Sequence, residues 1–160
     1  METQDYVKLV HFLGYGMLFT AGVAGWILGQ QYNKAADYKE KSVILRASRP
    51  VGLLGPIGIL IMLITGIGNM HARSLGVFTE NWLTLKILFF AIASINGVFF
   101  GIRAAKRGKM VGQLAEGTAP SGTEGKVKSM DTQFRIFYIA QIVLMLLILT
   151  LSIVKPGRGM

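Results

Sequence analysis

The chain has 160 residues, of which 52% are hydrophobic; it carries a formal net charge of +9 and contains no cysteine. The lack of cysteine excludes disulfides, thiolate metal sites and iron–sulfur clusters. The basic residues are spread over short connectors between long apolar segments, so we expect no nucleic-acid binding; this distribution is typical of membrane-topology signals.

Four apolar segments follow one another along the chain, and they cover about residues 7–29, 51–70, 82–102 and 136–154. Each can cross the hydrocarbon core of a bilayer, which takes a helix of about 20 residues. The connectors are too short to fold as domains of their own. The sequence therefore predicts an all-α, multi-pass membrane protein, a four-helix transmembrane bundle that forms a single domain over residues 1–160.

The first segment follows a lead-in, residues 1–8, that holds two acidic residues and one basic residue. No small-residue cleavage site comes after the segment, so we expect a retained helix rather than a signal peptide. Residues spaced by the helical period of about 3.6 share one face of this helix. On one such face lie His11, Gly14, Leu18, Gly22, Gly25 and Gly29. Glycines on one face let another helix, a second copy or a flat ligand approach the backbone.

The connectors differ in charge. The first and third hold most of the basic residues, namely Lys34, Lys39, Lys41, Arg46, Arg49, Arg103, Lys106, Arg107, Lys109, Lys126, Lys128 and Arg135. The other side has only Lys8, Arg73, Lys155 and Arg158. The positive-inside rule then predicts that connectors one and three are cytoplasmic, with both termini and the second connector outside. We expect a flexible cytoplasmic loop over about residues 108–130, because 117–125 reads GTAPSGTEG.

The later helices also carry small or polar faces with helical spacing, which predicts that these faces line the interior of the bundle. In chain order they read Gly55, Met62, Gly66 and Asn69; then Lys86, Phe90, Ala93 and Gly97; then Tyr138, Gln141, Met145 and Ser152.

Few polar groups enter the apolar segments, and the predicted topology places four of them in the same outer half of the bilayer: His11, Asn69, His71 and Lys86. Such residues are costly to bury and are candidates for function. His11 is a possible ligand of a metal or haem iron, or a hydrogen-bonding group between helices. Lys86 is an internal cation for an anionic cofactor group, or extends to the headgroups. His71 is a second ligand or only a helix-end residue.

Short motifs in chain order give a family resemblance. They are YVKLVH ending at His11, the pair Arg49 and Pro56, the late Gly66, WLTLK from Trp82 to Lys86, and FRIFY from Phe134 to Tyr138. Together they resemble the HemJ-type protoporphyrinogen oxidases and the related CopD-like small membrane proteins, over nearly the whole chain.

The resemblance implies a four-helix protein that binds haem b and oxidises protoporphyrinogen IX. It also implies that His11 and Lys86 are the essential residues, with Lys86 catalytic and His11 on the metal. Tyr138 and Ile139 stand where the family has Asn and Glu. Because that change removes a proton acceptor, we expect haem contact to carry over better than oxidase activity.

Three functions follow as hypotheses. The first is a haem- or quinone-associated redox protein of the bacterial inner membrane, alone or as a small subunit of a larger complex, with Asn69 and His71 among the cofactor contacts. The second is a non-catalytic accessory subunit of a respiratory or photosynthetic complex. The third is a CopD-like copper importer, which the scattered methionines disfavour. The partners expected are the lipid bilayer, other membrane subunits, or a second copy packed through the glycine-rich faces.

Overall fold

The computed structural model describes residues 3–72, 74–77 and 80–154, and over these residues the chain is helical apart from turns. Arg73, Lys155 and Arg158, which entered the charge comparison, lie outside the described residues. The helices are α1 (Thr3–Lys34), α2 (Tyr38–Ala47), α3 (Arg49–Ala72), α4 (Asn81–Ala115) and α5 (Thr123–Val154). Four stretches, α1, α2–α3, α4 and α5, are long and apolar enough to cross a membrane. The predicted all-α fold with four such segments is confirmed.

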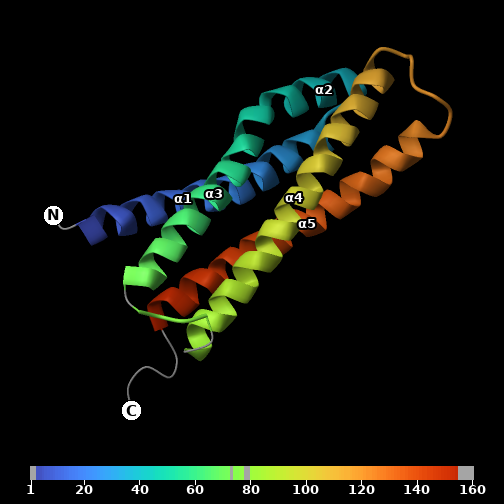
Figure 1. Cartoon of the computed structure of the whole chain (residues 1–160). Helices are drawn as coiled ribbons and strands as arrows, with labels where there is room; N and C mark the ends of the chain where they lie inside the picture. The colour runs from blue at the N-terminus through green and yellow to red at the C-terminus, as the bar shows by residue number, and fades with distance from the viewer. Residues whose placement is uncertain (1–2, 73, 78–79, 155–160) are drawn as a thin grey trace.

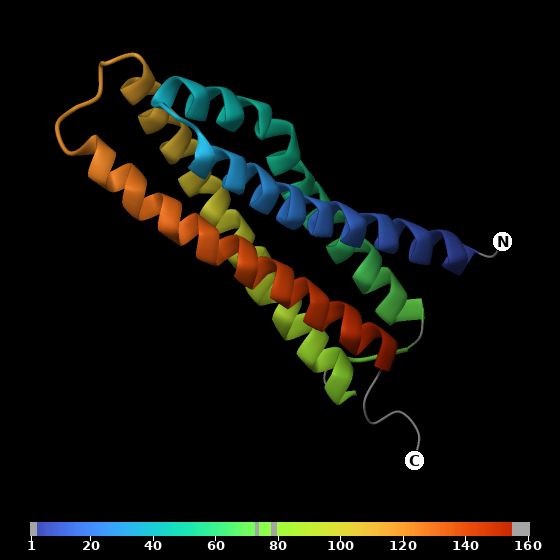
Figure 2. The same cartoon turned by 180° about the vertical axis from the view of Figure 1, so that it is seen from behind.

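Two helix pairs make up the bundle (Figure 1). Helix α1 lies along α3, and α4 lies along α5, while α1 also packs on α5. The start of α1 and the end of α5 lie at one end of the bundle. Helix α2 and the loop between α4 and α5 lie at the other, as the view from behind also shows (Figure 2). We call these ends the terminal end and the basic end.

Glycines bring α1 and α3 into close backbone contact. A Cβ atom on Gly58 would lie 2.8 Å from the carbonyl oxygen of Gly14 and 2.9 Å from Cγ of Leu18. No side chain fits there, because the contact is with the backbone of the neighbouring helix. The predicted glycine face of α1 is confirmed at this crossing. On α3 the residue in contact is Gly58. Gly55 was predicted to face the interior of the bundle, but a Cβ atom on it would meet nothing within 4 Å.

The same face of α1 packs on α5 farther along. A Cβ atom on Gly25 would collide with the ring of Tyr138, and one on Gly22 would lie 3.6 Å from Ile142. Tyr15 donates a hydrogen bond of 2.9 Å to the carbonyl oxygen of Met145. The glycines are thus used within one chain, and self-association through this face stays a prediction.

The core of the bundle forms where the predicted inner faces meet. Its buried side chains are Leu18, Met62, Met145 and Ile148. Next to it, Gln141 donates a buried hydrogen bond of 3.3 Å to the carbonyl oxygen of Ala93, which joins α5 to α4. Side-chain bonds of this kind between helices suit a medium without water.

The third connector is shorter than expected. Helix α4 continues to Ala115 and α5 begins at Thr123, so the loop predicted over about 108–130 spans only 116–122. Val111 and Val127 are fully buried against Tyr32 beyond the apolar segments. This small core packs α4 against α5 past the point where the hydropathy of the sequence falls. The two helices can continue there because lysine, arginine and glutamine are themselves good helix formers.

The first connector contains a helix that the hydropathy pattern missed. Helix α2 begins after Asp37, whose side chain accepts a hydrogen bond of 2.8 Å from the backbone N–H of Glu40. In return, Glu40 accepts a bond of 2.7 Å from the backbone N–H of Ala36. This arrangement is a variant of the capping box, in which Glu40 bonds to the residue before the N-cap Asp37 rather than to the N-cap itself. The sequence signature, Asp37 followed three residues later by Glu40, is present in the chain.

We predict that Gly58→Ala destabilises the bundle, because the added methyl group meets the backbone of Gly14. Overpacking of this kind costs about 1–3 kcal/mol. Thermal unfolding of the detergent-purified protein should show a melting temperature several degrees lower. Gly52→Ala is the matched control, since a Cβ atom there meets nothing within 4 Å. Equal melting temperatures for the two variants would contradict the close α1–α3 crossing.

Candidate functional site

A cavity of about 260 Å³ lies between the four long helices at the terminal end. It exceeds the ~150 Å³ of an apolar cavity known to hold a benzene molecule. Three of the four predicted site residues line it: His11 from α1, Asn69 from α3 and Lys86 from α4. The fourth, His71, is exposed and is not part of the lining. The structure thus brings together residues that are far apart in sequence.

The imidazole of His11 is fixed by a hydrogen bond across the α1–α3 interface. Its Nδ1 lies 2.8 Å from Oγ1 of Thr65. The Thr65 hydroxyl donates its only hydrogen to the carbonyl oxygen of Ile61, at 2.6 Å. Oγ1 must therefore accept at the other contact, so Nδ1 of His11 carries the proton and Nε2 keeps its lone pair. Histidines that bind metals are oriented in the same way, by a hydrogen bond from the other ring nitrogen.

Two basic side chains line the cavity, and one of them is already paired with a carboxylate. Lys86 is half-buried and lines the cavity, and it is near enough to act electrostatically on the His11 ring. Lys8 lines it as well and is paired with Asp5 at 3.1 Å. No glutamate or aspartate is among the lining residues that the structure describes. An anionic group would therefore be stabilised here.

The remaining lining is mostly apolar, and part of it was not predicted. Trp82 is buried and lines the cavity. Its indole N–H donates to the side chain of Glu80 at 3.1 Å. Met70 of the lining was also missed. So was Thr65, which contacts His11 from outside the lining; it lies one helical turn before Asn69 and could have been identified from that spacing. The other apolar lining residues include Met62, Leu83, Ile87, Phe90 and Ile148.

Among the described residues, this lining offers one imidazole and many apolar side chains rather than the cluster of ligands that a bare metal ion needs. In the described part of the chain, no three His, Cys, Asp or Glu side chains gather as metal ligands. Haem needs only one or two axial ligands from the protein, because the macrocycle supplies the others. An imidazole, a cation and an apolar wall are groups of the kind that hold haem in proteins.

Comparisons with family models, with curated proteins and with solved structures gave no significant match. The resemblance to the HemJ-type and CopD-like proteins therefore stays a prediction from short motifs.

We predict that His11 is the Nδ1–H tautomer at neutral pH in the cofactor-free protein. His71→Gln leaves His11 as the only histidine, because the chain has two. Nitrogen-15 NMR of this variant should show a protonated Nδ1 and an unprotonated Nε2. Adding Thr65→Val should shift the population toward the Nε2–H form, whereas Thr65→Ser should not. An Nε2–H signal with threonine present would contradict the assignment.

Proposed function

We propose that the protein is a haem-binding redox protein of a membrane, with the cavity at the terminal end as the haem site. The observation that supports this most strongly is the His11 imidazole, in contact with Thr65 through Nδ1, on a cavity that Lys86 also lines. The expected tautomer leaves Nε2 unprotonated. His11 would ligate the haem iron and Lys86 would pair with a propionate, with Asn69 as an additional polar contact.

The residues in and around the cavity have separate tasks in this proposal. The Thr65 hydroxyl holds the His11 ring in one orientation and raises its basicity as a ligand. Trp82, Phe90 and the aliphatic side chains exclude water, which strengthens the interaction between Lys86 and an anion. When bound, haem would supply one-electron chemistry. Oxidation of protoporphyrinogen IX is the activity that the resemblance suggests.

The topology belongs to the same proposal. The basic end would face the cytoplasm of a bacterium, with the chain in the inner membrane, because most lysines and arginines lie at that end. The haem site would then open near the outer surface of the membrane. The bilayer is the first partner, and a larger membrane complex is the second.

We predict that the purified protein shows a Soret band with resolved bands after dithionite reduction, and that His11→Ala abolishes them. His71→Ala is the matched control, because it removes the other imidazole, which is exposed and away from the cavity. Its spectrum should be unchanged. Equal loss in both variants would contradict the assignment of His11. A featureless spectrum from folded, unmodified protein would favour the accessory-subunit hypothesis instead.

We predict that Lys86→Met makes haem dissociate faster, while Lys86→Arg retains it. Loss of a charge-assisted hydrogen bond costs about 1.5–3 kcal/mol, which is a tenfold or greater effect on affinity. The measurement is the rate of haem transfer to an excess of a haem-scavenging globin. Unchanged rates in Lys86→Met would show that the ammonium group extends to the lipid headgroups and does not hold the cofactor.

A further inference from the structure

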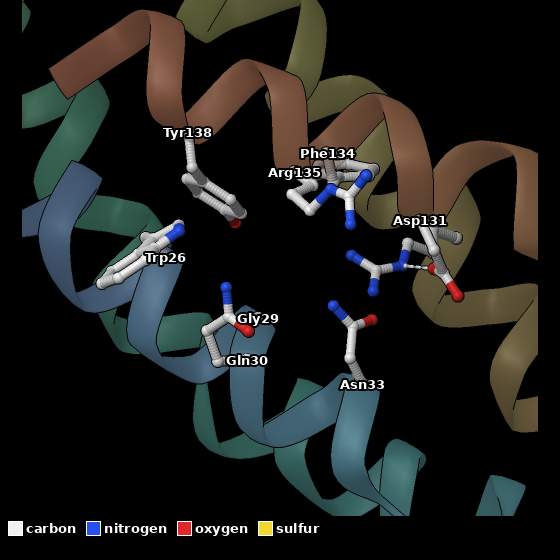
Figure 3. A pocket seen from close by; sticks show the side chains of 9 residues that line it. Trp26, Gly29, Gln30, Asn33, Asp131, Phe134, Arg135 and Tyr138 are labelled. Atoms are coloured by element: carbon white, nitrogen blue, oxygen red, sulfur yellow. Dashed lines mark ion pairs between the residues drawn. The ribbon is translucent and has the colours of Figure 1, made fainter. Parts of the chain in front are cut away.

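A second, smaller cavity lies at the basic end between α1, α4 and α5 (Figure 3). Its inner space is about 20 Å³, which holds a water molecule or a single oxygen of a ligand. The side chains of Gln30, Asn33, Arg135 and Tyr138 point into it from two opposite helices. Trp26 closes one side of the same space. Each of these five side chains can donate a hydrogen bond.

The buried side of the cavity is formed by Arg107 of α4, which is only 5% exposed. Its Nε forms an ion pair with Asp131 at 2.8 Å, and its guanidinium group lies over the rings of Tyr32 and Phe134, with Cζ at 4.1 and 4.7 Å from their centres. The guanidinium plane is thereby fixed. Asp131 is bound through Nε, so the two terminal nitrogens are not used in that ion pair.

The charges at this cavity do not balance. Two guanidinium groups, those of Arg107 and Arg135, face the single carboxylate of Asp131. Arg107 is buried and stationary, whereas Arg135 is exposed and can close over a ligand from the rim. An anion with several acceptor oxygens would restore neutrality and would accept from donors on both helices. A phosphate group meets both requirements, and paired arginines are well suited to it.

We propose that this cavity binds a phosphate group, with one phosphate oxygen in the inner space against Arg107 and the others held at the rim by Arg135 and the amides of Gln30 and Asn33. The inner space is too small for a ring or a sugar, so the rest of the ligand lies outside the protein. Trp26 lies at the rim, where tryptophan commonly marks a membrane interface. The phosphate therefore comes from an anionic phospholipid or from a soluble phosphate compound.

The test uses Trp26 as the reporter, in a Trp82→Phe background that removes the only other tryptophan. The protein in neutral detergent is titrated with short-chain phosphatidylglycerol, inorganic phosphate or acetate. We expect saturable changes in Trp26 emission with phosphatidylglycerol, with phosphate, or with both. Saturation by the lipid alone identifies a headgroup site, and saturation by inorganic phosphate alone identifies a soluble ligand. Native mass spectrometry of the unmodified chain should show the same ligand retained.

Arg135→Gln should weaken this binding by about tenfold or more, because it removes a charge-assisted contact. Arg103→Gln is the control; Arg103 is another arginine near the basic end, but it packs on Phe99 and does not line the cavity. Its affinity should stay within about twofold of the parent. No saturable change, equal losses in the two variants, or equal binding of acetate would overturn the proposal. None of these outcomes depends on haem, which belongs to the other end of the bundle.

Discussion

The close approach of the α1 and α3 backbones at Gly14 and Gly58 sets the position of the residues around it. From this point the antiparallel register is fixed. His11 lies about one helical turn from Gly14 toward the start of α1, and Thr65 lies about two turns from Gly58 toward the end of α3. In this register His11 lies opposite Thr65, at 2.8 Å. The orientation of the imidazole therefore depends on a contact one to two turns away that involves no functional group. A side chain at Gly58 would disturb the site without touching it.

Much of this arrangement could be predicted from the sequence, because a membrane protein shows its hydrophobic pattern over long segments. The inner faces through Met62, Ala93, Gln141 and Met145 were correct, since helical periodicity determines which residues share a face. The grouping of His11, Asn69 and Lys86 followed from alternating helix direction alone. Topology is thus sufficient to find candidate residues on different helices, provided that each lies at a similar depth.

What the sequence did not predict depends on contacts between helices outside the apolar segments. Hydropathy places helix ends where charged residues begin, but Val111 and Val127 bury each other beyond that point and carry α4 and α5 onward. The Arg107–Asp131 pair, at 2.8 Å, belongs to the same extension. Each partner alone resembles an ordinary solvated charge of a connector. Only the tertiary structure shows that Arg107 is buried, because burial is a property of the packed pair and not of the local sequence.

The two cavities are separated by the apolar core, and this separation limits what the protein can do. Leu18, Met62, Met145 and Ile148 form a packed layer between the His11 cavity and the Arg107 cavity. A cation moving from one end to the other would have to leave its polar ligands to cross that layer, at a cost of several kcal/mol or more. The basic cavity would also repel it. Both features disfavour the copper importer and favour a protein that holds an anionic cofactor at one end and an anionic group at the other. If both proposals hold, the bundle is a rigid support for two stationary ligands, which requires tight glycine packing rather than an open path.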